Sequence, residues 1–184
     1  MTPDEWQAVL GPMDGWAERH VLAAFGALGL RSPYLDVGCG TGAMANMAHR
    51  LGIEAVGVDR IGPLHGEEWL RRHDLRDPLD LGQRFALVTS LEVAEHIPSE
   101  HDATFCDSVA RHVADGGLLV FTAAHPGQGG EEHVNCRPAS YWRTMFHDRG
   151  LSWSREDSLR LALVWSWLGS PCYWLAANVQ VFTR

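Results

Sequence analysis

The sequence contains no lysine, and all 15 basic residues in its 184 are arginine. Lysine provides the amine of Schiff-base enzymes and the phosphate-binding cation of the Walker A loop, so this chain has neither kind of site and no lysine base. Its 23 acidic residues leave a net charge of −8. Because a protein that binds duplex nucleic acid needs a basic surface, we expect no duplex nucleic-acid partner.

Cysteine is scarce as well. The four cysteines, Cys39, Cys106, Cys136 and Cys172, are widely separated and form no CxxC pair. This spacing suggests neither a zinc ribbon nor a thioredoxin-like motif, and reduced thiols are the simpler interpretation. The opening stretch, MTPDEWQAVLG, lacks the basic and apolar regions of a signal peptide. We therefore predict a cytoplasmic protein.

Long hydrophobic runs are absent. The segment 161–177 carries no charge, but it includes Gly169 and Pro171 and falls short of the ~20 residues that span a bilayer. We expect no membrane span. The segment predicts instead a buried helix-loop-strand element or a lid over a substrate.

The apolar pattern predicts strands alternating with helices. The expected strands lie at 34–38, 53–59, 85–91, 118–125 and 178–184, with a shorter element at 71–75. The expected helices are two pieces within 4–29, then 41–51, a helix from Ser99 to the glycines at 116 and 117, and 139–148. Ser99 and Asp102 have the form of a capping box for the helix that begins at Ser99. Alternating elements with several uniformly apolar strands indicate an α/β protein with a mainly parallel sheet covered on both faces.

The stretch DVGCGTGA, 36–43, predicts a sharp turn from a strand into a helix. Its glycines let the backbone approach a ligand at the carboxyl ends of the strands, where open α/β sheets bind ligands. The spacing of Gly38, Gly40 and Ala43 also satisfies the dinucleotide fingerprint. Asp59 ends the second strand and could hold the ribose of NAD or of another nucleoside ligand. The glycines alone thus leave NAD and other nucleosides open.

DVGCGTG, with Asp36 two positions before the first glycine, resembles motif I of the class I S-adenosylmethionine (SAM) dependent methyltransferases. The resemblance covers 34–134. It implies that Asp59 binds the ribose hydroxyls and that Asp74 contacts the adenine amine, with Asp77 as a nearby substitute. The implied SAM site comprises Asp36, Gly38, Cys39, Gly40, Gly42, Asp59, Arg60, Asp74, Leu75, Ser90, Leu91 and Glu92.

The same resemblance implies a fold and a domain organisation. The fold is a Rossmann-like, doubly wound sheet with helices on both faces and an antiparallel C-terminal strand. We expect a single domain over 1–184, with an N-terminal helical segment at 1–30, a cofactor-binding core at 34–134 and a substrate-side segment at 135–184.

The stretch EVAEH places Glu92, Glu95 and His96 at the end of an apolar strand. One helical turn would put all three on one face, where the two carboxylates repel each other. The cluster could simply begin a helix, with its acids near the positive end of the macrodipole. Alternatively, His96 could be a general base, or a divalent cation could neutralise the carboxylates.

E-x-x-E-H at this place resembles the ubiquinone-biosynthesis O-methyltransferases and the enzymes that methylate the terminal ribose of small RNAs. The resemblance implies a divalent ion, Mg, Mn, Fe or Zn, held by Glu92, Glu95, His96 and His133. The candidate catalytic residues are His96, His133, His125 and Glu92. Of the two histidines in the loop after the fifth strand, His133 matches the small-RNA enzymes better in position than His125.

These observations predict a SAM-dependent methyltransferase that acts on a small molecule, with a hydroxyl oxygen as the favoured acceptor. The tryptophan-rich C-terminal part is expected to pack in the core or to line an apolar acceptor pocket. The alternatives are a 2′-O-methyltransferase of an RNA 3′ end, an NAD-dependent oxidoreductase and a nucleoside-binding regulatory protein. The sequence carries no signal for an oligomeric state.

Overall fold

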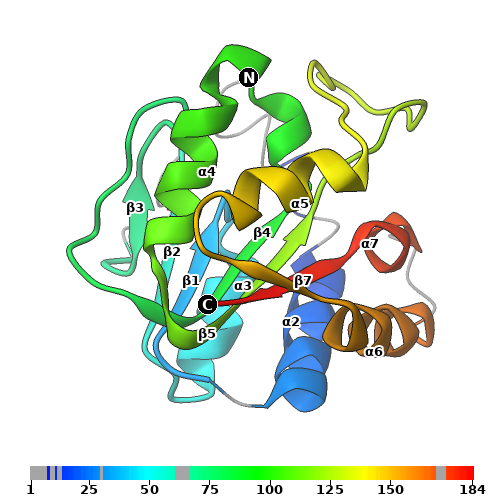
Figure 1. The fold of residues 1–184 in the computed structure, drawn as a ribbon. Coiled ribbons are helices and arrows are strands. Elements are labelled where there is room, and N and C mark those ends of the chain that lie inside the picture. Colours follow the sequence, from blue (N-terminus) through cyan, green and yellow to red (C-terminus); the bar gives the residue numbers. More distant parts are fainter. Residues whose placement is uncertain (1–7, 9–10, 12–13, 30, 61–66, 169–172) are drawn as a thin grey trace.

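A computed structural model of the chain describes residues 8, 11, 14–29, 31–60, 67–168 and 173–184 (Figure 1). Its strands form one seven-stranded sheet in the order β3-β2-β1-β4-β5-β7-β6. The strands are β1 (Tyr34–Val37), β2 (Ala55–Asp59), β3 (Leu70–Arg72), β4 (Phe85–Leu91), β5 (Val113–Thr122), β6 (Ser152–Ser154) and β7 (Gln180–Thr183).

Most of the sheet is parallel. β1 pairs in parallel with β2 and β4, β2 with β3, and β4 with β5. β7 runs antiparallel to both β5 and β6. The predicted Rossmann-like sheet with an antiparallel C-terminal strand is therefore confirmed. The strand order reverses direction around β1 and β4, which is where sheets of this kind bind ligands.

Helices cover both faces of the sheet (Figure 1). The helices are α2 (Asp14–Leu28), α3 (Ala43–Arg50), α4 (Asp102–Arg111), α5 (Ala139–His147), α6 (Arg155–Ser166) and α7 (Tyr173–Asn178), with short 3₁₀ turns η2 (Ala94–His96) and η3 (Ser99–His101). Side chains of α4 and α5 share one hydrophobic cluster with the sheet, and side chains of α2, α3, α6 and α7 share the other.

The strands alternate their side chains between these two clusters. Leu35 and Val37 of β1 belong to the α4/α5 cluster, whereas Tyr34 belongs to the α2/α6 cluster. All three are fully buried. Burial on both faces explains why the strands appear in the sequence as uninterrupted apolar runs.

The structure corrects the predicted start and end of α4. No side-chain cap bond forms at His101, the N-cap residue, so the Ser99–Asp102 capping box is wrong. The helix ends at Arg111, and Gly116 and Gly117 lie inside β5. The register between β4 and β5 shifts after Phe85, and Gly116, with φ +71°, accommodates the irregular backbone of this stretch.

The uncharged segment 161–177 also differs from the prediction. Its described residues belong to α6, to a turn at 167–168 and to α7, so the expected strand is a helix. Leu161, Trp165 and Leu175 are buried against the sheet. Among the described residues, no helix combines the length and the apolar character that a membrane crossing requires. The first of the two helical pieces predicted within 4–29 lies mostly outside the described residues.

Candidate functional site

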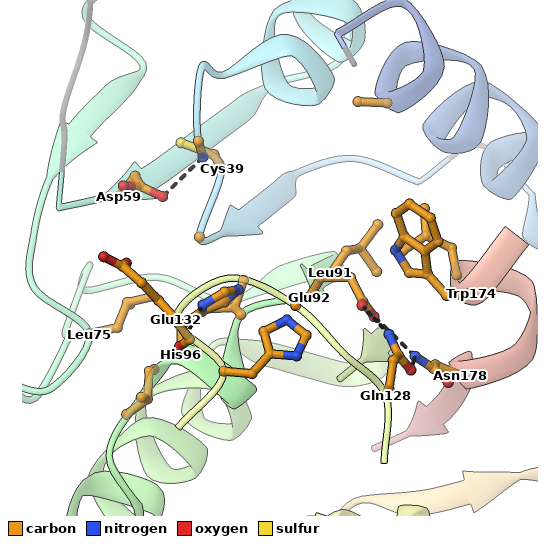
Figure 2. A pocket seen from close by; sticks show the side chains of 18 of the residues that line it. Cys39, Asp59, Leu75, Leu91, Glu92, His96, Gln128, Glu132, Trp174 and Asn178 are labelled. Atoms are coloured by element: carbon orange, nitrogen blue, oxygen red, sulfur yellow. Dashed lines mark hydrogen bonds between the residues drawn. The ribbon is translucent and has the colours of Figure 1, made fainter. Parts of the chain in front are cut away.

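A cavity of about 1230 Å³ opens along the carboxyl ends of β1, β2, β4 and β5. Pockets for one small molecule usually measure ~300–1,000 Å³, so this cavity has room for a cofactor and a second ligand. In Figure 2, Asp59 and Cys39 face His96 and Glu132 across the cavity, with Glu92, Gln128 and Asn178 farther along it.

The glycine loop between β1 and α3 forms one wall. Gly38 has φ +79°, and a Cβ added there would lie 2.3 Å from Cγ2 of Val93. The backbone N–H of Gly40 donates to Oδ2 of Asp59 at 3.0 Å, which joins the loop to the end of β2. The loop is thus a close-packed turn that only glycine fits, and it places backbone atoms and a carboxylate on the same wall of the cavity.

The N-terminal helix touches the same loop. The Thr41 hydroxyl donates to Oδ1 of Asp14 at 2.6 Å, and both residues line the cavity. Burial raises the pKa of Asp14 above its ordinary value, and the bond from Thr41 opposes this shift. Helix α2 therefore closes one side of the space beside the glycine loop.

Asp74 lies on the cavity wall beyond β3, next to Leu75. Nε of Arg76 donates to Oδ1 of Asp74 at 2.9 Å. Hydrogen bonding by Arg76 lowers the pKa of Asp74 to about 2. The carboxylate is therefore ionised over the physiological range and can accept a hydrogen bond from a ligand amine.

The EVAEH stretch does not form the helical turn that its spacing predicts. Glu92 has φ +54°, and the 3₁₀ turn η2 begins only at Ala94. Glu92 accepts hydrogen bonds from Nε2 of Gln128 at 3.3 Å and from Nδ2 of Asn178 at 3.4 Å. Its carboxylate is thus held by two amides rather than aligned on one face with His96.

Glu95, His96 and His133 do come together. Each offers a ligand atom, and the three atoms lie within 4.8 Å of one another. The rings of His96 and His133 have centroids 5.0 Å apart, and Nε2 of His133 lies 4.0 Å from Oε1 of Glu95. Glu92, the fourth predicted ligand, lies outside this group.

The environment of the three residues suits ligand atoms. Nδ1 of His96 donates to the Glu132 carbonyl at 3.2 Å, which leaves the Nε2 lone pair of His96 available. Glu95 is fully buried, and its Oε2 has no hydrogen-bond partner among the described residues. Burial, and next the charge of Glu92, raise the pKa of Glu95 to about 8. Burial, and next His133, lower the pKa of His96.

The remaining wall comes from the C-terminal part of the chain. Tyr173, Trp174 and Asn178 of α7 line the cavity. Nδ2 of Asn178 also donates to Oε1 of Gln128 at 2.9 Å, which ties α7 to the loop after β5. The C-terminal tryptophans only partly follow the expectation of core or pocket: Trp142 and Trp165 are buried in the core and Trp174 lines the cavity, whereas Trp153 and Trp167 are exposed outside it.

A family model described as a methyltransferase domain matches residues 13–163. The chain belongs to this methyltransferase domain family. The match takes in the glycine loop, the EVAEH stretch and the loop that carries His133.

Curated relatives of this methyltransferase domain include ubiquinone biosynthesis O-methyltransferases. The protein from Nitrobacter winogradskyi is 32% identical over 96 residues, which are 47% of this chain and 36% of that protein. The protein from Alkalilimnicola ehrlichii is 34% identical over 119 residues, which are 58% of this chain and 43% of that protein. The chain thus matches less than half the length of each of these relatives.

Solved structures share the fold of this methyltransferase domain. An amino pentose methyltransferase from Micromonospora echinaspora, with SAM bound, superposes with a TM-score of 0.64 at 18% identity, covering 92% of this chain and 90% of that one. A sugar N-methyltransferase from Streptoalloteichus superposes with a TM-score of 0.60 at 18% identity, covering 93% and 86%.

Most of the residues proposed from the sequence line the cavity. Those lining it are Gly38, Cys39, Gly40, Asp59, Arg60, Asp74, Leu75, Leu91, Glu92, His96, His125 and His133. Asp36 and Ser90 are fully buried outside its lining, and Gly42 packs against Leu70. His125 lies on the wall, but outside the group formed by Glu95, His96 and His133.

The sequence reasoning missed Gln128 and Asn178, the two amides that hold Glu92. Asn178 is only 8% exposed. A polar residue directly before an apolar closing strand was the available signal. Its partner could not be identified, because the contact joins segments 50 residues apart.

Proposed function

We propose that the chain is a SAM-dependent methyltransferase acting on a small molecule that presents a hydroxyl group. The observation that carries this proposal is one cavity whose lining includes the glycine loop, Asp59, His96 and His133, with the buried Glu95 grouped behind the two histidines. Membership of the methyltransferase domain family supports SAM over NAD as the nucleoside.

The cofactor side of the cavity fits SAM. Asp59, at the end of β2, and Asp74 both line the cavity. In this proposal Asp59 accepts hydrogen bonds from the ribose hydroxyls, and Asp74 accepts one from the adenine amine. The closely packed turn at Gly38 brings the backbone near the ligand without an intervening side chain. When bound, SAM supplies an activated methyl group, and the protein has to align an acceptor with it.

A hydroxyl acceptor also has to lose its proton. Because Nδ1 of His96 carries the hydrogen donated to Glu132, Nε2 of His96 can accept a proton at neutral pH. The lowered pKa of His96 keeps this imidazole neutral and ready to act as a base. His96 would thus take the hydroxyl proton as the oxygen bonds to the methyl carbon of SAM, and the sulfur would keep the electrons of the broken carbon–sulfur bond.

As an alternative to a free His96 base, we propose that Glu95, His96 and His133 hold a divalent ion, which would occupy Nε2 of His96 because Nδ1 carries the hydrogen donated to Glu132. One carboxylate and two imidazoles suit zinc, iron or manganese better than magnesium, which prefers oxygen ligands. The unpartnered Oε2 of Glu95 and the outer hydrogen bond of His96 fit such a site. A cation there would favour the ionised forms of Glu95 and of an acceptor hydroxyl.

The decisive experiment is incubation of the protein with methyl-labelled SAM and an extract of small metabolites, followed by mass analysis of labelled products. We expect a methylated hydroxyl compound, and we expect His133→Ala and Glu95→Gln to lower its formation at least tenfold. His101→Ala, which changes a histidine outside the cavity, is the matched control. Absence of any labelled product from extracts of several sources would contradict the activity.

The metal proposal needs a separate test. Turnover should fall after chelation and return when zinc, iron or manganese is added, with magnesium as a comparison. If the chelated protein keeps its full rate, the ion has no part in the reaction and His96 alone remains as the proposed base.

A further inference from the structure

The segment that carries His133 is fastened to Glu95 through the backbone. The N–H groups of Val134 and Asn135 both donate to the Glu95 carbonyl, at 2.9 and 3.0 Å. This contact joins the loop after β5 to the turn after β4, 38 residues or more away in sequence. The distance between His133 and Glu95 side chains therefore depends on how firmly residues 134 and 135 are held.

A buried side-chain network holds them. Nδ2 of Asn135 donates to Oδ1 of Asp102 at 2.7 Å, and Nε of Arg137 donates to Oδ1 of Asn135 at 2.8 Å. The Tyr141 hydroxyl donates to the other oxygen of Asp102, also at 2.7 Å. Asn135 is 4% exposed and Asp102 is 3% exposed. The network thus connects the His133 segment to the first turns of α4 and α5.

Asp102 is in an unusual place for an acid. The first turn of a surface helix usually exposes its acidic side chains, and the sequence suggested a capping role. A buried carboxylate loses its hydration, and hydrogen-bond donors on both oxygens have to compensate for that loss. Here the donors are Asn135 and Tyr141, which come from the segment following His133. A fully satisfied buried network of this kind fixes the relative position of the segments that it joins.

We propose that Asn135 is a positioning residue, which, through its hydrogen bond to Asp102, holds His133 in place beside Glu95 and His96. This inference rests on the proposed function for its chemical purpose, but it concerns a structural coupling that can be measured without turnover. Asn135 and Asp102 do not line the cavity. They act on the site through the backbone bonds that Val134 and Asn135 donate to Glu95.

The test is an exchange of the two partners. Asn135→Asp at pH 8 places two carboxylates 2.7 Å apart in a buried site, where they repel each other. The double variant, Asn135→Asp with Asp102→Asn, again has one amide and one carboxylate, now with the carboxylate at position 135 and the amide at position 102. Two quantities are measured in each variant: hydrogen exchange of the Val134 amide in the protein alone, and the affinity for cobalt(II) added as a spectroscopic probe of the histidine–carboxylate group.

We expect Asn135→Asp to accelerate exchange of the Val134 amide at least tenfold and to weaken cobalt(II) binding roughly 10- to 100-fold, as changes in the residues that support metal ligands do. The swapped pair should recover most of both losses. The matched control is Ser158→Ala, which removes an equally buried hydroxyl that accepts from the Val181 amide at 2.9 Å, away from the cavity. Ser158→Ala should lower the stability of the protein without a selective change in hydrogen exchange of the Val134 amide.

Two outcomes would overturn the proposal. One is an Asn135→Asp variant whose Val134 exchange changes no more than in Ser158→Ala. The other is a swapped pair that recovers neither quantity. If Asn135→Asp does not fold, Tyr141→Phe serves in its place, because it removes one hydrogen-bond donor to Asp102. It should accelerate Val134 exchange and weaken cobalt(II) binding by smaller factors. Unchanged Val134 exchange in Tyr141→Phe would then overturn the proposal.

Failure of the proposed function gives a different result. If the unchanged protein binds no cobalt(II), the metal site is refuted. The coupling of Asn135 to the His133 segment is then decided by the exchange data and the swap alone.

Discussion

At the residue scale, two buried carboxyl groups beside the cavity have strongly raised pKa values. Asp36 in β1 and Glu95 in η2 are both fully buried, and each has one oxygen without a hydrogen-bond partner among the described residues. Burial is the main cause that raises their pKa values, to about 7 and about 8. The hydroxyl of Thr89 donates to Asp36 at 2.7 Å and offsets part of that shift.

These raised pKa values predict a dependence of stability on pH. Between the ordinary value of 3.8 and about 7, folded Asp36 keeps a proton that the unfolded chain has released. The folded state therefore binds more protons, and the free energy of unfolding falls as the pH rises through this window. Glu95 contributes in the same direction from its ordinary value of 4.5 up to about 8.

We expect Asp36→Asn to remove part of this slope and Asp36→Asn with Glu95→Gln to remove most of it. Urea unfolding at half-unit steps from pH 5 to 8.5 measures the slope. Asp115→Asn, at a side chain that is 90% exposed, should leave the slope unchanged. A double variant as steep as the unchanged protein would show that the two acids are ionised in the fold.

At the scale of single elements, the sequence predicted the strands better than the turns. Residues 85–91 form β4 with the bounds that their apolar run indicated. The capping box failed because Asp102 turns inward to Asn135 and Tyr141, a choice that depends on a segment more than 30 residues away. The helical turn expected at EVAEH failed for a similar reason, since Glu92 is drawn to Gln128 and Asn178. Local spacing cannot reveal these partners.

The turn between β1 and α3 allows a sharp prediction. Gly38 and Gly52 have nearly the same φ, +79° and +76°, so alanine at either position carries a similar backbone strain of ~1–2 kcal/mol. Only at Gly38 does the new Cβ meet another residue, Val93 at 2.3 Å, whereas nothing lies within 4 Å at Gly52. Gly38→Ala should therefore lower the free energy of unfolding by more than Gly52→Ala does.

Binding provides the second measurement on this pair. Because Gly38 lines the cavity, Gly38→Ala should weaken SAM binding at least tenfold in calorimetry, and Gly52→Ala should leave it unchanged. Equal SAM affinities for the two variants would place the cofactor away from the glycine loop.

At the scale of the whole molecule, the sheet collects into one cavity residues that are far apart in the sequence. The resemblance in the glycine loop and the EVAEH stretch was enough to predict the fold, and most of the residues that it named line this cavity. It could not predict the contacts that α2 and α7 make through Asp14 and Asn178, because these depend on how the helices pack over the sheet. The cavity is also larger than one small ligand needs, which the sequence does not show.

Thermal unfolding with each nucleoside tests this assembly as a unit. A ligand that binds only the folded state stabilises it by about 2.7 kcal/mol when present at 100 times its dissociation constant. For a chain of this length, that corresponds to a rise in Tm of roughly 5–10 °C. We expect such a rise with SAM and none with NAD at the same concentration.

Asp59→Asn is the informative variant for this measurement. An amide oxygen at this position can still accept from Gly40, so the loop should stay in place, but the negative charge that we propose binds the ribose is lost. The rise in Tm with SAM should shrink markedly, while Asp115→Asn should retain it in full. A rise with NAD that exceeds the rise with SAM would reverse the assignment of the cofactor, because it would mean that the cavity is built around a dinucleotide.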